Sequence, residues 1–364
     1  MAAFRDGKIV QLLDTRSDLI RARVTLGDTE IDAVAFPSMI GELRVGDRVI
    51  VNTLGIELEL GTGGDGFILW NMDGGEVEPG DGHIVKLRYT PWQTEVMAAE
   101  APESEHHGTL EDIGSIDGLP VIACGLHSQI AGVAAGIKAA RPGARVGYLM
   151  SDGGSLPLVW SRLVADLRSA DLIDVTCTYG HAFGGDLETV NVFSGLAALD
   201  AIGRCDVVVA AMGPGGVGTG TRLGYSGIEQ AQVVDAVGAL GGRAIVCLRI
   251  SFSDARSRHE GVSHHSLTSL GLVARAATVV VPELPAEQGE VIAEQLRALD
   301  RSVEHQLVTA AGNAGVDLLV ERGIGVDTMG RSLSAAPEPF LAAAAAGAVG
   351  AGMVTDRRGK WGSP

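Results

Sequence analysis

Four polar, glycine-containing loops each follow a short apolar run in the middle of the chain, and this arrangement constrains the fold most. The loops begin at Ser151, Gly180, Gly213 and Ser251. Apolar runs of about six or seven residues bounded by glycine are typical of buried strands. Segments of helical length separate these runs, and strands that alternate with helices predict a parallel α/β sheet. Because ligands bind beyond the carboxyl ends of such strands, the four loops predict the place of a site.

Residues 118–364 are therefore expected to form an α/β domain with a doubly wound, mainly parallel sheet and three layers. The apolar runs begin at Leu119, Arg145, Leu172, Asp206, Arg243 and Ala277. The helical segments between them are 128–140, 155–170, 190–202, 226–240 and 263–276. Several of these segments open with Ser, whose side-chain oxygen can accept hydrogen bonds from the free amides of a first helical turn. The tail from residue 303 is expected to add one or two strands and a final Ala-rich helix.

The first part of the chain, residues 1–96, has a different pattern. Short segments of alternating polar and apolar residues are separated by Gly and Asp turns, which predicts a small β-barrel or sandwich. The strand-like stretch 83–89 is expected to close it. Residues 97–117 lack an apolar period and contain acidic residues, Ala and Pro, so they are expected to be a linker.

The charge of the chain excludes several classes of partner. The formal net charge is −17 and no basic stripe offsets it, which argues against nucleic acid and against an anionic membrane. No export signal is recognisable at the start, so a cytoplasmic protein is expected. The Ala- and Gly-rich run 340–354 is too short to span a bilayer and predicts a buried helix. Four cysteines without metal-type spacing are expected to be buried free thiols.

The densest group of chemically versatile side chains lies in the fourth loop and the segment after it. His259, His264 and His265 follow Arg249 within a short stretch, and imidazole serves near neutral pH as a general base or a metal ligand. Adjacent residues of a helix lie on different faces, so we expect only one of the His264–His265 pair to enter the site. The alternative is a solvated loop whose histidines bond to nearby backbone groups.

The second loop carries His181, Asp186 and Glu188. An imidazole and two carboxylates at this spacing could act as an acid/base pair or bind a divalent ion. The candidate metal ligands are therefore these three residues together with His264. The alternative is structural, with Asp186 as a helix N-cap and Glu188 in the first turn.

The third loop is rich in glycine. Gly213, Gly215 and Gly218 match the spacing of a dinucleotide-binding loop, but the acidic residue expected at the end of the next strand is missing, since that strand ends at Arg249. The sequence thus argues against a dinucleotide. It favours a nest of amides for an anion, and the residues expected to bind it are Gly213, Gly215, Gly216, Gly218, Thr219, Thr221 and Arg249. A tight, closely packed turn is the alternative.

Two further site candidates lie after other strands of the predicted sheet. His127 follows the first strand and Asp152 follows the second. Both are candidate acid/base residues, because the same sheet edge brings them toward the other loops. Arg222, Tyr225 and Glu229, which follow the glycine loop, are secondary candidates for orienting a substrate.

Four segments, YLMSDGGSLP, TYGHAFGGDLE, MGPGGVGTGT and RHEGVSHHSLT, occur in this order. On these motifs the chain resembles a bacterial family of proteins of unknown function, the domain-of-unknown-function family numbered 3866. The resemblance spans most of the chain, including the β-rich start. It implies that the chain is to be treated as one unit, and it implies no activity.

Three classes of function follow from the predicted site. The first is a cytoplasmic enzyme that acts on a small anionic metabolite, phosphorylated or not, by acid/base or metal-assisted chemistry. The second is a non-catalytic ligand-binding or sensory protein that uses the same pocket. The third is a structural or assembly protein whose glycine-rich segments and Ala-rich tail pack subunits into a homo-oligomer.

Overall fold

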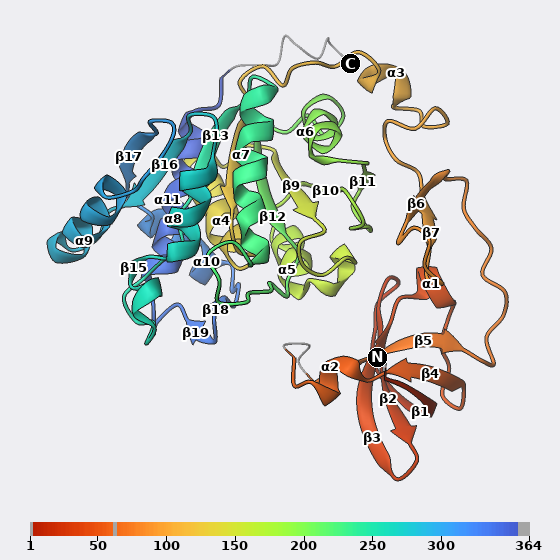
Figure 1. The fold of residues 1–364 in the computed structure, drawn as a ribbon. Helices are drawn as coiled ribbons and strands as arrows, with labels where there is room; N and C mark the ends of the chain where they lie inside the picture. The colour runs from red at the N-terminus through yellow and green to blue at the C-terminus, as the bar shows by residue number, and fades with distance from the viewer. Residues whose placement is uncertain (1–2, 61–63, 356–364) are drawn as a thin grey trace. The chain divides into compact units, whose positions relative to one another are not determined.

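The computed structural model describes residues 3–60 and 64–355. The chain divides into two compact units, Met1–Glu95 and Val96–Pro364. The described strands of the first unit contribute nothing to the large sheet of the second (Figure 1). The stretch 97–117, expected as a linker, packs on the second unit. Ala98 and Ala99 are buried, the Ala99 amide donates to the carbonyl of Glu188 at 2.7 Å, and Ile116 lies in the core of that unit.

The first unit is a closed barrel with the strand order β1-β2-β3-β5-β4, which confirms the predicted β-rich domain. Its strands are β1 (Phe4–Thr15), β2 (Ile20–Leu26), β3 (Thr29–Ala35), β4 (Arg48–Asn52) and β5 (Gly66–Asn71). Along β2 the buried residues are every second one, because alternate side chains of a strand point to opposite faces. Two short helices accompany the barrel, α1 (Pro37–Ile40) and α2 (Leu54–Glu57).

The expectation that residues 83–89 close the barrel is wrong. The barrel closes where β1 pairs with both β2 and β4. The short strand β6 (Ile84–Lys86) instead pairs with β7 (Thr94–Val96) in a separate two-stranded sheet. At twelve residues β1 is long enough to bend and pair along both edges, and register shifts in its pairing with β2 provide the bend.

The second unit contains an eight-stranded sheet in which all neighbouring strands are parallel, with the order β11-β10-β9-β12-β8-β13-β16-β17. The first strand in sequence, β8, lies inside the sheet, and the chain extends the sheet on both sides of it. This confirms the expected α/β fold. The strands are β8 (Pro120–Cys124), β9 (Val146–Ser151), β10 (Val175–Thr178), β11 (Leu187–Glu188), β12 (Val207–Met212), β13 (Arg243–Cys247), β16 (Thr278–Pro282) and β17 (Gln306–Ala310).

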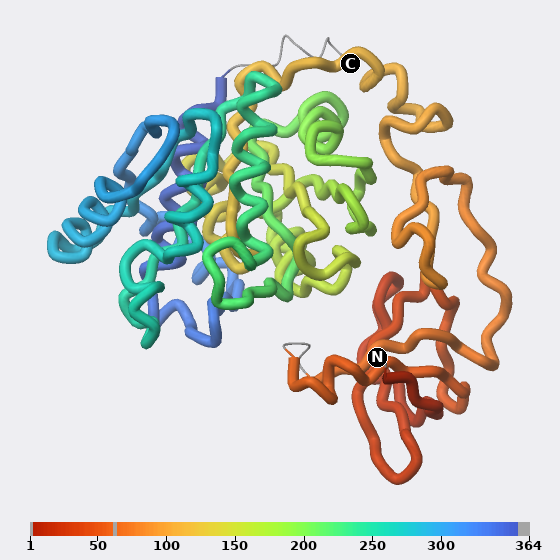
Figure 2. The backbone as a smooth tube through the Cα atoms, viewed as in Figure 1, coloured from red at the N-terminus to blue at the C-terminus, as the bar shows by residue number. Residues whose placement is uncertain are grey.

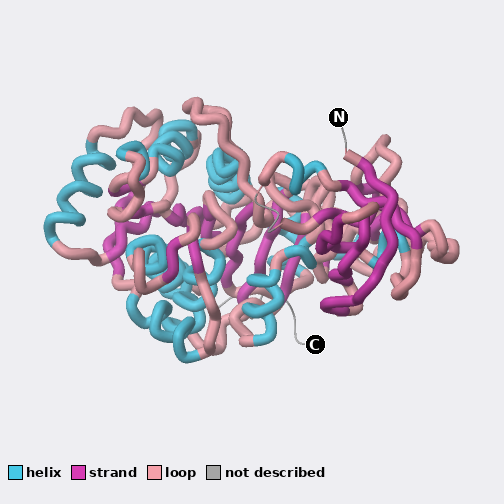
Figure 3. The backbone as a smooth tube through the Cα atoms, turned by 90° about the horizontal axis from the view of Figure 1, so that it is seen from below, coloured by secondary structure: helices cyan, strands magenta, loops and turns pink. Residues whose placement is uncertain are grey.

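Helices cover both faces of this sheet, as the end-on view shows (Figure 3). Alternate residues of each strand face opposite sides, so Val121 and Ala123 of β8 join one core, while Ile122 and Cys124 join the other. The first core includes residues of α6 (Val192–Ala201), α7 (Glu229–Ala239), α8 (His264–Leu272) and α9 (Ala286–Arg297). The second includes residues of α4 (Gln129–Ala140), α5 (Arg162–Ser169), α10 (Asn313–Glu321) and α11 (Glu338–Gly352).

The first long helix of this unit and its last one, α4 and α11, pack side by side (Figure 2). Glycines make this close approach possible. A Cβ at Gly136 of α4 would collide with the backbone carbonyl of Ala344 in α11, and a Cβ at Gly347 would collide with the carbonyl of Val133. The Ala-rich tail is thus a buried helix, as expected. No helix within residues 3–60 and 64–355 combines the length and the apolar character needed to cross a bilayer.

The predicted helix starts are correct for some segments and displaced for others. Ser263 caps α8 by accepting a hydrogen bond from the His265 amide. The helix expected from residue 155 begins only at Arg162, where Ser161 is the cap. The four cysteines are free and buried, as expected. The other short elements of the unit are α3 (His107–Leu110), β14 (Ile250–Ser251), β15 (Gly261–Val262), β18 (Asp327–Thr328), β19 (Arg331–Ser332) and three 3-10 helices, Leu158–Trp160, Ser226–Ile228 and Ser257–His259.

Candidate functional site

Three histidines meet at the start of α8, beyond the carboxyl end of β13. His259, His264 and His265 each offer one ring nitrogen as a ligand atom, and these atoms lie within 4.8 Å of one another. Among the described residues, these three form a group that could hold a metal ion. The ring centroids of His264 and His265 are 4.2 Å apart, and both rings lie about 5 Å from that of His259, at 4.9 and 5.2 Å. Both rings of the His264–His265 pair lie close to His259, whereas the sequence predicted that they would lie on different faces of the helix. We call these three residues the histidine triad.

Neighbouring side chains hold two rings of the triad in place. Nδ1 of His259 lies 2.7 Å from Oγ of Ser263, which leaves Nε2 of His259 for a ligand. The ring of Tyr225 stacks on that of His265, with centroids 3.9 Å apart and planes 11° from parallel. The Tyr225 hydroxyl donates to the backbone carbonyl of His265 at 2.7 Å. Such partners orient metal-ligating imidazoles in known sites.

The triad is neutral at physiological pH. Burial, followed by the charges of Arg249 and Arg256, lowers the pKa of His259 to about 3. Burial, followed by the charge of His264, lowers the pKa of His265 to about 4. Burial also lowers the pKa of His264, and the charge of nearby Arg258 adds to this effect. Neutral imidazole is the protonation state that a metal ion binds.

Arginines surround one buried carboxylate beside the triad. The side chain of Asp254 is 2% exposed, and Oδ2 lies 2.9 Å from Arg256 and 3.6 Å from both Arg249 and Arg331. Its hydrogen bonds with the Arg256 guanidinium hold the pKa of Asp254 well below its usual range. Three guanidinium groups around one carboxylate leave excess positive charge, which favours a bound anion.

A second cluster lies at the end of β9, where the Ser151 hydroxyl donates a short hydrogen bond to the carboxylate of Glu229. Burial raises the pKa of Glu229 to about 7; the Ser151 hydroxyl opposes this shift, and the charge of Asp152 adds to it. Burial also raises the pKa of Tyr179, whose hydroxyl interacts with Ser151. Gly153 lies close to this cluster, so a Cβ at that position would displace the Glu229 carboxylate. A carboxyl group with a pKa near 7 suits general acid/base work.

His127 has structural contacts on both ring nitrogens. Nδ1 lies 3.0 Å from the carbonyl of Met212 and Nε2 lies 2.7 Å from Oγ of Ser161. The Tyr148 hydroxyl is 3.3 Å from Nδ1. Burial lowers the pKa of His127 to about 4. The side chain therefore ties β12 and the start of α5 to the loop that follows β8.

The second loop divides into residues with different contacts. The Asp186 carboxylate accepts from the amide and hydroxyl of Thr176 and from Arg168, at 2.8 to 3.0 Å. The Glu188 carboxylate accepts from the hydroxyl of Thr178 and from the amides of two glycines. These hydrogen bonds stabilise the loop, so both carboxylates have a structural role. The structure does not bring Asp186 or Glu188 into the ligand group that contains His264.

His181 lies beside the second cluster. Its backbone amide donates to Oδ2 of Asp152 at 2.9 Å, and Gly180 has a positive φ of 68° at the preceding position. A Cβ at Gly180 would also collide with the Asp152 carboxylate. The loops after β9 and β10 thus meet, as parallel strands that end at one edge predict.

The glycine loop is exposed from Gly215 onward and bonds largely to itself. Oγ1 of Thr219 and Oγ1 of Thr221 lie 2.9 Å apart, and both contact Gly224. Gly213 at the start is instead buried, and a Cβ there would collide with the carbonyl of Ser155. Gly215 adopts a φ of 90°, which requires glycine. The remaining predicted residues of this loop, Gly216 and Gly218, lie in its exposed part.

Three residues of these clusters had a weak signal or none in the sequence. Glu229 stood only among the secondary candidates, because a single Glu in a first helical turn is common. Arg331 was not predicted at all. It comes from the short β19 strand of the tail and meets Asp254 through the fold alone. Ser263 could have been recognised as a capping residue, but not as a partner of His259.

No curated protein and no solved structure matches the chain. The family model described as "Protein of unknown function (DUF3866)" matches residues 32–347. The match includes part of the barrel, all of the strand ends described above, the histidine triad and Arg331. On this evidence the chain belongs to the DUF3866 family.

Proposed function

We propose that this protein is a metal-dependent enzyme that acts on a small anionic metabolite. The observation that carries the proposal is the histidine triad, in which three neutral imidazoles converge within 4.8 Å. Three histidines with a fourth position left open are a ligand set of catalytic zinc sites. A bound divalent ion would supply an activated water or polarise a substrate oxygen.

The surroundings of the triad fit this role. With metal–nitrogen bonds of about 2.0 to 2.1 Å, a tetrahedral site places its ligand nitrogens about 3.4 Å apart. Metal binding would thus draw the ligand nitrogens together by up to about 1.4 Å. Ser263 and Tyr225 hold two of the rings, so the movement is confined. The nearby arginines oppose a bare cation, and the same charges attract an anionic substrate to it.

Metal analysis tests the proposal. The full chain is purified without chelator, supplied with zinc, manganese or iron in turn, and assayed for bound metal by mass spectrometry. We expect about one metal ion per chain in the natural protein, and a loss of at least ten-fold in affinity for the variants His264→Ala and His265→Ala, since each loses one of three ligands. The control variant His181→Ala, outside the triad, is expected to keep the metal.

A hydrolysis screen with phosphate, carboxylate and lactone esters then separates an enzyme from a binding protein. Turnover that requires the metal and fails in His264→Ala supports the enzyme. Metal binding without turnover of any of these substrate classes would favour the sensory alternative. If the natural chain binds no metal, or if the triad variants bind it as well as the control, the metal proposal is wrong.

A further inference from the structure

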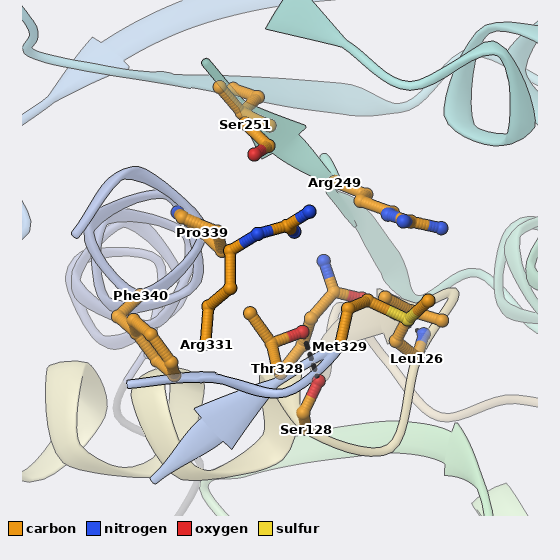
Figure 4. A pocket seen from close by; sticks show the side chains of 11 residues that line it. Leu126, Ser128, Arg249, Ser251, Thr328, Met329, Arg331, Pro339 and Phe340 are labelled. Atoms are coloured by element: carbon orange, nitrogen blue, oxygen red, sulfur yellow. Dashed lines mark hydrogen bonds between the residues drawn. The ribbon is translucent and has the colours of Figure 1, made fainter. Parts of the chain in front are cut away.

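A small pocket lies beside the triad, between β14, the β18–β19 hairpin and the first turns of α4 and α11. Figure 4 shows the guanidinium group of Arg331 extending across it toward the segment that carries Arg249 and Ser251. Arg249, Ser251 and Arg331 therefore line the pocket from two segments that are far apart in sequence. We call it the arginine pocket.

The charges in this pocket are unbalanced. Asp254 engages Arg256 through hydrogen bonds of 2.9 and 3.0 Å. Its contacts with Arg249 and Arg331 are both 3.6 Å long, which is beyond hydrogen-bond distance. The guanidinium groups of Arg249 and Arg331 thus share one carboxylate that already serves a third, Arg256. The side chain of Arg249 is only 10% exposed and that of Arg331 is 26% exposed, so water screens their charges incompletely.

The other polar groups at the pocket do not offset this charge. Oγ of Ser128 lies 3.0 Å from Oγ1 of Thr328, so these hydroxyls bond to each other. The Gln129 amide nitrogen donates to the carbonyl of Leu248 at 3.1 Å. Ser251 is buried and lines the pocket, and its Oγ accepts a hydrogen bond from the Ser253 amide at 3.3 Å. A hydroxyl and two guanidiniums are donors that match the oxygens of a carboxylate or phosphate group.

We propose that the arginine pocket binds the oxyanion group of a small molecule, a carboxylate or a phosphate, through Arg249 and Arg331. Arg249 also contacts the residue that holds a ring of the triad, since its backbone carbonyl accepts a hydrogen bond from the Ser263 amide at 2.9 Å, and Oγ of Ser263 lies 2.7 Å from Nδ1 of His259. It therefore links the pocket to the triad. This inference rests on the proposed function: the oxyanion is the charged end of the substrate, and the other end of the substrate reaches the metal.

Binding of inorganic phosphate and of propionate tests the pocket, measured by titration calorimetry on the full chain in chelator at constant ionic strength. We expect the natural chain to bind at least one of these anions. We expect Arg331→Gln and Arg249→Gln each to weaken binding at least ten-fold. The control Arg297→Gln removes one positive charge from an exposed site at the end of α9 and is expected to bind as the natural chain does.

Each outcome is decisive for the pocket. Binding of phosphate alone, or of propionate alone, identifies the group, and weaker binding in both pocket variants supports the proposal. If neither anion binds the natural chain, or if the folded pocket variants bind as tightly as Arg297→Gln, the proposal is wrong. Circular dichroism shows which variants are folded, and the two pocket variants lie on different segments, so one remains informative if the other unfolds. Because the chelator removes any bound metal, this experiment measures anion binding alone. A chain that does not bind the anion can therefore be distinguished from one whose triad does not bind metal.

Discussion

Replacing Glu229 with Gln is expected to remove the part of the pH dependence of stability that arises from ionisation of this buried carboxyl group. The pKa of Glu229 is raised by burial from its ordinary value of 4.5 to about 7. Since 1.36 kcal/mol accompanies each pH unit, ionising this carboxyl group costs the native state up to about 3 kcal/mol. Between pH 4.5 and 7 the native protein holds a proton on Glu229 that the unfolded chain has lost. Stability therefore falls as the pH rises through this window, and the cost persists above it.

The variant Glu229→Gln cannot ionise, and its amide oxygen can still accept the hydrogen bond that the Ser151 hydroxyl donates. We expect the free energy of unfolding of the variant, relative to the natural protein, to rise by up to about 3 kcal/mol between pH 5 and pH 8. Urea denaturation, followed by the far-ultraviolet circular dichroism of the helices, measures this difference at each pH. Comparing variant with natural protein cancels the contributions of the buried histidines.

The control is Glu287→Gln, since Glu287 also lies in the first turn of a helix but is exposed. Both substitutions remove a carboxylate that interacts with a helix N-terminus. The control is expected to show no comparable gain from pH 5 to pH 8. If the stability difference between Glu229→Gln and the natural protein is the same at both pH values, the reasoning about the buried carboxyl group is refuted.

Three further predictions test the packing and the assignment of structural roles. Gly136→Ala should destabilise the α/β unit by about 1 to 3 kcal/mol, because the new Cβ collides with the carbonyl of Ala344, whereas Gly289→Ala, with open space around it, should stabilise by about 0.5 to 1 kcal/mol; urea midpoints that move in the same direction would contradict this. His127→Ala should cost about 1 to 3 kcal/mol in thermal or urea unfolding while the metal content stays unchanged, and an unaltered melting temperature would argue against its bridging role. Asp186→Ala should lower the melting temperature with the metal retained, and loss of metal at an unchanged melting temperature would make Asp186 a ligand instead.

The sequence by itself determined most strands of the sheet and the sheet edge at which the candidate site lies. The apolar runs that begin at Leu119 and Arg145 became the strands β8 and β9, because burial of both sheet faces requires continuous apolar stretches. The polar loops after the strands met at the carboxyl edge, as in the contact between Asp152 and the His181 amide. These features depend on local patterns of apolar and polar residues, and each pattern can be recognised within one short segment of the sequence.

A first limit of local pattern appears at α5. A helix was predicted from residue 155, yet the chain first runs beside the second loop, where the Leu158 amide donates to the carbonyl of Phe183. Only then does Ser161 cap the helix. The partner that delays the helix lies in another loop, so no propensity within the segment could reveal the delay.

Only the tertiary structure decided which side chains of the loops lie close to one another. It placed both His264 and His265 against His259, because the loop before α8 folds over the first turn of that helix. It placed the Asp186 carboxylate against Thr176 of β10, the strand before its loop, and it brought Arg331 from the tail to Asp254. Such contacts depend on strand order and on how distant loops pack, and these are properties of the whole folded chain that no local sequence period encodes.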